Sequence, residues 1–153
     1  EVVGNTDHAS GVVDDVTTVD SASLLPFRTA IEAGVPAVMI SSARYSKIDA
    51  KNQAVFSSKV IGRLRDWDFD GVVISDDLGA AASVAKMPAG QRALRFLAAG
   101  GDVVINASPA LVGPMVGAVK AEAGKDEDFA EQVTQSAARV LRMKQGLGIV
   151  SCG

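Results

Sequence analysis

Two adjacent aspartates, Asp76 and Asp77, give the sequence its clearest indication of chemistry. They follow residues 71–75 (GVVIS), whose apolar, β-branched character predicts a buried strand. A carboxylate at the end of such a strand is held rigidly and partly shielded from water, and it can serve as a nucleophile, a general base or a metal ligand. A single aspartate there often only caps the next turn. Two in succession favour a functional role, because capping needs only one.

A second candidate group lies near the start of the chain, in Asn5-Thr6-Asp7-His8. His8 is the only histidine, so a histidine-dependent proton transfer within this chain would use it. Asp7 beside it would orient the imidazole ring or act as the acid itself. The alternative interpretation is an exposed loop histidine without a role.

The third candidate group is Arg44 and Tyr45, in a polar stretch after an earlier apolar run. Arg44 is suited to binding a carboxylate or a phosphate, and Tyr45 to stacking on a sugar ring. A pair between Arg44 and Asp49 within the same loop is an equally good interpretation. The chain has one histidine and one cysteine, and no glycine-rich nucleotide-binding motif. We therefore expect no metal site and no cofactor.

Short apolar runs alternate with amphipathic segments along the rest of the chain, which predicts an α/β fold with parallel strands covered by helices. In such folds the carboxyl ends of the strands share one edge, where functional side chains gather. Residues 1–20 and 42–55 are polar and aperiodic, and we expect loops there. The predicted strands are 37–41, 71–75 and 102–106, and the predicted helices are 21–34, 57–67, 90–99, 109–123 and 127–145.

Composition narrows the class of protein. The 153 residues are 48% hydrophobic and 22% charged, with a formal net charge of −3, which suits a globular domain and argues against disorder. No apolar run approaches the roughly 20 residues that a bilayer requires, so no membrane span is expected. Lysine and arginine are scattered along the chain, so nucleic acid is not an expected partner. Cys152 is the only cysteine and can form no internal disulfide.

Several segments, taken in order, resemble the catalytic domain of glycoside hydrolase family 3, especially its β-N-acetylglucosaminidase branch. The resemblance covers essentially the whole chain. It implies the C-terminal part of a TIM-type (β/α)8 barrel: residues 1–153 would form a partial barrel domain, with 1–20 as a catalytic loop and 21–153 as the last three strands and their helices. The segments that carry it are LPFR (25–28), AGVPAVM (33–39), FDGVVISDDL (69–78) and AAGGD (98–102).

The resemblance also implies a reaction, the retaining hydrolysis of terminal β-linked N-acetylglucosamine in cell-wall or related glycans. Asp76 corresponds to the family's nucleophile, and Asp77 would tie the loop to main-chain N–H groups. Met39 looks like part of the wall of the substrate site, and Asn5 and Arg44 are further substrate-binding candidates.

The loop at residues 5–8 departs from the family pattern. In the N-acetylglucosaminidase branch a histidine, oriented by an aspartate in an Asp-Ser-His run, is the acid/base. An ungapped alignment puts Asp7 at the histidine position and Asn5 at the aspartate position, whereas a shift of one residue puts His8 there. We favour Asp7 as the acid/base, with His8 assisting.

Two other functions stay open on the residues alone. A magnesium-dependent phosphoryl-handling domain would use Asp76 and Asp77, but it predicts a lysine at another strand end, where Asn106 stands. A carbohydrate-binding relative without catalytic activity fits the altered loop at residues 5–8. Because the family's Lys-His-Phe-Pro-Gly-His-Gly motif belongs just before residue 4, we expect a fragment, or a chain that pairs with the missing N-terminal half of the barrel or with a second chain. Alone, it should have little activity on its carbohydrate substrate.

Overall fold

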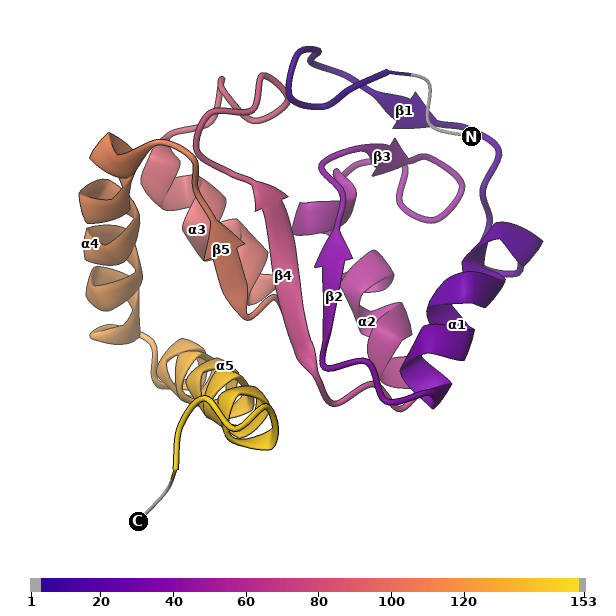
Figure 1. The fold of residues 1–153 in the computed structure, drawn as a ribbon. Helices are drawn as coiled ribbons and strands as arrows, with labels where there is room; N and C mark the ends of the chain where they lie inside the picture. The colour runs from indigo at the N-terminus through magenta and orange to yellow at the C-terminus, as the bar shows by residue number, and fades with distance from the viewer. Residues whose placement is uncertain (1–3, 152–153) are drawn as a thin grey trace.

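The computed structural model describes residues 4–151 and contains a three-stranded parallel sheet in the order β2–β4–β5 (Figure 1). The strands are β2 (Ala37–Ile40), β4 (Val72–Asp77) and β5 (Val103–Ile105). All three lie where the sequence predicts strands, and β4 extends two residues further to include both aspartates. Each connection between neighbouring strands contains a helix, as parallel pairing requires.

The five predicted helices are present, with ends that differ from the prediction by a few residues. Ser57 caps α2, because its Oγ accepts a hydrogen bond from the Val60 N–H at 3.3 Å. Gly34, at φ +80°, follows the end of α1, which fits the predicted glycine stop. The helices are α1 (Leu25–Glu32), α2 (Ser58–Asp66), α3 (Ala89–Ala98), α4 (Val112–Ala123) and α5 (Glu127–Gly146), with short 3-10 turns at Ala22–Leu24, Ala54–Phe56 and Pro109–Leu111.

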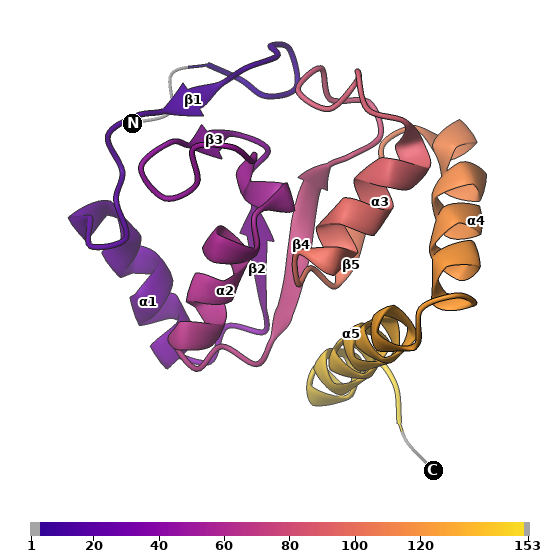
Figure 2. The ribbon, with the colours of Figure 1, turned by 180° about the vertical axis from the view of Figure 1, so that it is seen from behind.

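One face of the sheet is packed against helices. Figures 1 and 2, which view the molecule from opposite sides, place α2 and α3 over this face. Here Val38 and Val73 of the sheet belong to one buried cluster with Ile61 of α2 and Phe96 of α3. Burial of these side chains is the main source of the fold's stability.

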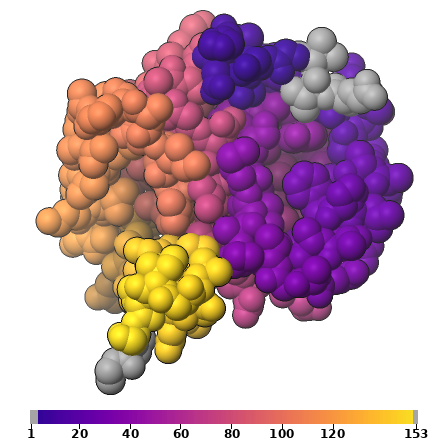
Figure 3. Space-filling model, in the orientation of Figure 1, coloured from indigo at the N-terminus to yellow at the C-terminus, as the bar shows by residue number. Residues whose placement is uncertain are grey.

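Most of the other face of the sheet is uncovered among the described residues, and α5 lies at its lower end in the space-filling view from the same side (Figure 3). Met39 of β2 is 59% exposed and Ile105 of β5 is 41% exposed. An apolar hollow of about 460 Å³ also lies beside β2, lined by Met39 together with Phe27 of α1 and Trp67 at the end of α2. Apolar surface is therefore left open on this face and beside β2.

A second, two-stranded sheet corrects the prediction of uninterrupted loops at residues 1–20 and 42–55. β1 (Val13–Asp14) pairs in parallel with β3 (Arg44–Tyr45), and the Arg44 N–H donates to Val12 O at 3.0 Å. Two-residue strands are too short to produce an alternating pattern in the sequence. The pair fixes the N-terminal segment beside the loop that follows β2.

The carboxyl ends of β2 and β4 point to the same end of the molecule, at the top of Figure 1, where β1 and β3 also lie. This arrangement confirms the α/β prediction, and parallel strands that alternate with helices are the arrangement of part of a TIM-type barrel. No helix in residues 4–151 combines the length and apolar character needed to cross a bilayer.

Candidate active site

Asp76 lies at the carboxyl end of β4 and is hydrogen-bonded by three neutral donors. Its Oδ2 accepts from the Ser42 N–H at 3.1 Å and from Thr6 Oγ1 at 3.0 Å, while Oδ1 accepts from the Asp77 N–H at 2.9 Å. No lysine or arginine within residues 4–151 forms an ion pair with it. The carboxylate is thus oriented by loops from two other parts of the chain and keeps a partly exposed edge.

An irregularity in the strand pairing includes the residue that bears this carboxylate. Ile74 pairs with Val103 and Asp77 pairs with Ile105, so β4 has one residue more than β5 over the same stretch. Ser75, which is fully buried, accepts a hydrogen bond from the Ile105 N–H through its Oγ at 2.9 Å. Bulges of this kind re-aim side chains and are frequent beside active sites.

Asp77 ties the following loop to the sheet edge, as the family resemblance implies. Its Oδ1 accepts from the N–H groups of Gly79 at 2.7 Å and Ala107 at 2.9 Å, and its Oδ2 accepts from the Ala80 N–H at 2.9 Å. Burial alone would raise the pKa of Asp77, but these main-chain donors outweigh it and hold the pKa below its ordinary value. The two adjacent aspartates therefore have different environments.

The loop at residues 5–9 lies against the loop that follows β4. The Ser83 N–H donates to Thr6 O at 3.1 Å, and the Ala82 N–H donates to Asp7 O at 3.0 Å. Together with the hydrogen bond from Thr6 Oγ1 to Asp76, these contacts bring the N-terminal candidate group to the carboxyl end of β4.

Within that loop the predicted residues have different surroundings. Asn5 Oδ1 accepts a hydrogen bond from the Asp7 N–H at 2.8 Å, so the Asn5 side chain shapes the turn. The side chains of Asp7 and His8 are exposed, and neither forms a hydrogen bond within residues 4–151. Thr6, which the sequence did not single out, is the residue of this loop that contacts Asp76.

Arg44 lies in β3, and its side chain is directed into its own loop. Its NH1 donates to Ala50 O at 3.3 Å, while Asp49 accepts from Ser57 Oγ at 2.7 Å and from Asn52 Nδ2 at 3.0 Å. The suggested pair between Arg44 and Asp49 is therefore not formed. Met39, by contrast, projects from the exposed face of the sheet.

A buried arginine organises the loop after β4, and nothing in the sequence pattern marked it. Arg92 of α3 is 6% exposed and donates to the carbonyl oxygens of Leu78 and Gly79 at 2.8 Å each. It also donates to Met87 O at 2.7 Å and to Ala85 O at 3.2 Å. Because this loop supports residues 5–9, Arg92 acts on the site from a distance.

Parallel strands, intervening helices and an acidic residue oriented at the carboxyl edge are the arrangement of a barrel-type α/β enzyme domain. The family model "Glycosyl hydrolase family 3 N terminal domain" matches residues 3–143. The chain belongs to this family.

Known relatives agree with this assignment. A β-hexosaminidase of Xanthomonas oryzae pv. oryzae is 36% identical over 116 residues, which are 74% of this chain and 34% of that protein. The crystal structure of a β-N-acetylhexosaminidase from Beutenbergia cavernae is 44% identical with a TM-score of 0.90, covering 94% of this chain and 44% of that one. A family 3 β-N-acetylglucosaminidase from a Paenibacillus species is 27% identical with a TM-score of 0.84, covering 98% of this chain and 30% of that one. The chain thus spans about a third of the length of the curated relatives it matches.

Proposed function

We propose that this chain supplies part of the active site of a retaining glycosidase that removes terminal β-linked N-acetylhexosamine, with N-acetylglucosamine as the favoured sugar. One observation carries the proposal: Thr6 Oγ1 donates to Asp76 Oδ2, which joins the loop of the acid/base candidates to the carboxyl end of β4. Membership of the family and the activities named for the similar proteins support the glycosidase interpretation over magnesium-dependent phosphoryl transfer.

In the proposed reaction Asp76 is the nucleophile. A carboxylate oxygen of Asp76 forms a bond to the anomeric carbon as the bond to the leaving oxygen breaks, and the acid gives that oxygen a proton. Water then attacks the glycosyl-aspartate, the same acid/base accepts the proton from water, and Asp76 is released. The neutral donors on Asp76 suit this role, because they orient the carboxylate without the strong pairing that a cation would impose.

We assign the acid/base to Asp7, with His8 assisting. Both side chains are exposed at the carboxyl end of the sheet, and neither is committed to a hydrogen bond within the described residues. The main chain of Asp7 is fixed at both ends, because its N–H donates to Asn5 and its carbonyl accepts from Ala82. A fixed main chain with a free side chain suits a group that must reach two positions during one catalytic cycle.

In this proposal the substrate site lies on the open face of the sheet, which the rest of the barrel would cover. Met39 presents an apolar side chain on the open face of the sheet, where it would form part of the wall of the sugar site. We retain Asn5 and Arg44 as substrate-binding candidates that would act mainly by shaping their loops. The open face and the apolar hollow beside β2 fit a surface that the remaining strands of a barrel cover, whether those strands come from the same polypeptide or from a second chain.

The central test compares Asp76→Ala with the unchanged protein on an aryl β-N-acetylglucosaminide. We expect turnover to fall by on the order of 10⁴-fold or more, because the covalent intermediate cannot form. Asp15→Ala is the matched control, since Asp15 is an exposed aspartate without a hydrogen bond in the described chain. The assay uses residues 1–153 alone and together with a polypeptide that supplies the remaining barrel strands, and the chain alone should be much less active.

Labelling locates the nucleophile independently of rates. A fluorinated N-acetylglucosaminyl inhibitor that keeps the 2-acetamido group should leave its sugar on Asp76, detected by mass spectrometry of the peptides. Equal turnover by Asp76→Ala and the unchanged protein, or a label on another residue, would contradict the assignment. Sugar binding without turnover in the unchanged protein would support the non-catalytic carbohydrate-binding relative instead.

The acid/base assignment is tested through the leaving group. Asp7→Ala should lose about 10²- to 10⁴-fold in turnover on an alkyl glycoside, whose leaving oxygen needs a proton, and much less on a dinitrophenyl glycoside, whose leaving oxygen needs none. His8→Ala should show a smaller loss of the same kind. If only His8→Ala shows this dependence on the leaving group, the two roles are exchanged.

A further inference from the structure

Asp76 and four other residues form a closed ring of hydrogen bonds. Asp76 Oδ2 accepts from the Ser42 N–H at 3.1 Å and from Thr6 Oγ1 at 3.0 Å. On the far side of the ring, Gln53 Nε2 donates to Ser42 O at 2.8 Å and to Ser83 O at 3.1 Å. The ring closes where the Ser83 N–H donates to Thr6 O at 3.1 Å.

Gln53 is the side chain that joins the two halves of this ring. It precedes the 3-10 turn at Ala54–Phe56, and its carboxamide reaches the main chain of the loops that follow β2 and β4. A single –NH₂ group supplies both donors, so both carbonyls are satisfied from one point. No backbone hydrogen bond within residues 4–151 joins Ser42 to Ser83 directly.

The placement of Gln53 separates it from the reacting atoms and still links it to both catalytic candidates. Through the carbonyl of Ser42 it holds the residue whose N–H orients Asp76. Through the carbonyl of Ser83 it holds the residue whose N–H supports the loop of Asp7. A shift of either loop changes the distance between nucleophile and acid/base, and small errors in that distance reduce rates strongly.

We propose that Gln53 is a positioning residue that fixes the loop of Asp7 relative to Asp76. This inference rests on the proposed function and adds to it a residue with no role in substrate contact. Gln53 acts on the chemical step rather than on substrate binding, because the two loops that it joins carry the groups that make and break bonds.

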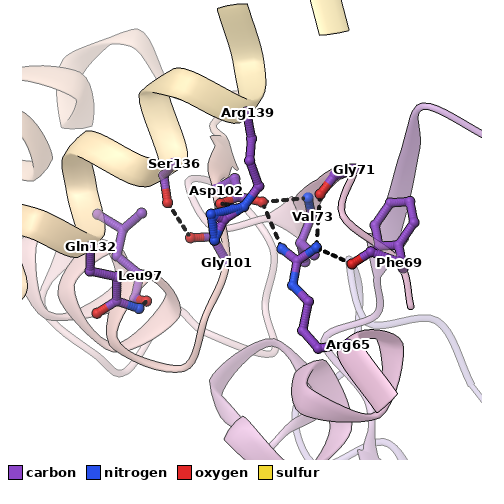
Figure 4. A network of polar contacts seen from close by, with 10 residues as sticks. All are labelled: Arg65, Phe69, Gly71, Val73, Leu97, Gly101, Asp102, Gln132, Ser136 and Arg139. Atoms are coloured by element: carbon purple, nitrogen blue, oxygen red, sulfur yellow. Dashed lines mark hydrogen bonds and ion pairs between the residues drawn. The ribbon is translucent and has the colours of Figure 1, made fainter. Parts of the chain in front are cut away.

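Two variants remove the donors while keeping the size of the side chain. Gln53→Met leaves a neutral chain of similar length, and Gln53→Glu places a carboxylate against two carbonyl oxygens. Gln132→Met and Gln132→Glu are the matched controls, because Gln132 Nε2 likewise donates to a main-chain carbonyl, Leu97 O, at 2.5 Å, between α5 and α3. The Gln132 contact lies in the region drawn in Figure 4, which does not include the ring around Asp76.

In the same assay we expect Gln53→Met to lower kcat by roughly 10- to 100-fold with little change in KM. The two variants, Gln53→Met and Gln132→Met, should lower the denaturation midpoint by similar amounts. Gln132→Met should leave kcat unchanged. Amide hydrogen exchange gives a second measurement that needs no turnover: the Ser83 amide should exchange about tenfold faster in Gln53→Met and at the unchanged rate in Gln132→Met.

These measurements separate this inference from the proposed function. If the unchanged protein hydrolyses the substrate and Asp76→Ala does not, the proposed function holds, and an unchanged kcat in Gln53→Met overturns the positioning role. If the unchanged protein shows no turnover, hydrogen exchange decides: faster exchange at Ser83 supports the link between the loops, and unchanged exchange overturns it. Equal losses of kcat in the Gln53 and Gln132 variants also overturn it, because a general loss of stability would then explain both.

Discussion

Two aspartates at opposite ends of the same sheet, Asp76 and Asp102, share one kind of contact and differ in the rest. Asp76 accepts the Ser42 N–H at the carboxyl end, and Asp102 accepts the Val73 N–H at 2.8 Å near the amino end of β4. The Asp102 side chain is completely buried and forms ion pairs with Arg65 at 3.3 Å and Arg139 at 3.4 Å (Figure 4). Asp76 is partly exposed and has only neutral partners among the described residues.

The arginines around Asp102 tie several elements together. Arg65 of α2 also donates to the carbonyls of Phe69 at 2.5 Å and Gly71 at 3.0 Å, just before β4 begins. Arg139 extends from α5, so one carboxylate links two helices to the sheet. Burial and the nearby charge of Arg139 lower the pKa of Arg65, and Asp102 opposes that change.

The same type of side chain is thus enclosed at one end of the sheet and left partly accessible at the other. Two cations and full burial leave Asp102 no open edge for a ligand. Neutral donors orient Asp76 and leave part of it accessible. This matches the general arrangement of parallel barrels, in which the amino end contributes stability and the carboxyl end contributes function.

The largest expected loss of stability comes from Asp102→Asn, which leaves two partly buried arginines without their counter-charge. We expect the free energy of unfolding to fall by about 3 kcal/mol, in the range for breaking a buried ion pair. The same change at Asp76, Asp76→Asn, should alter it by less than about 1 kcal/mol while abolishing turnover. Urea denaturation of the two variants provides the measurement, and equal losses of stability would remove the distinction drawn between the two ends.

The sequence predicted the position of the aspartates at the carboxyl end of the sheet much better than the contacts of Asp102 at its amino end. Asp76 and Asp77 are visible because an unbroken β-branched run leads into them, and the helices are visible from their spacing of apolar residues. Asp102 also precedes such a run, but its role depends on Arg65 and Arg139, which are 37 residues before it and 37 after it. Contacts between distant side chains leave no periodic signal in a single sequence.

The support around the candidate site was hidden for the same reason. Thr6, Gln53 and Arg92 act mainly through hydrogen bonds to side chains or carbonyl groups far along the chain. Main-chain acceptors are present at every position, so no residue type marks the partner. The β1–β3 pair was missed because strands of two residues carry no pattern. What the sequence could predict was the element that carries each group, and what it could not predict was how the loops meet.

A smaller loss of stability than at Asp102 is expected at Asp77, whose role resembles that of Asp102 although it lies beside Asp76. Its folded pKa is below its ordinary value because three main-chain N–H groups bind the carboxylate, even though burial acts in the opposite direction. The charged form therefore stabilises the fold at pH values above the unfolded pKa, which is about 3.9 for aspartate. That contribution is lost as the pH falls through the folded pKa.

Asp77→Asn keeps one acceptor oxygen and removes the charge, so it should cost about 1 kcal/mol at pH 7, roughly the net value of one hydrogen bond. The difference in unfolding free energy between the two proteins should then shrink as the pH falls below about 4, because Asp77 of the unchanged protein is protonated first in the unfolded chain and only at lower pH in the folded protein. Urea denaturation from pH 7 to pH 3 measures both curves. Asp14 and Asp49, whose pKa values are also held low by hydrogen bonds, are present in both proteins and cancel in the difference. A gap that stays constant with pH would mean that the charge of Asp77 contributes nothing, and that its oxygen atoms alone secure the loop beside Asp76.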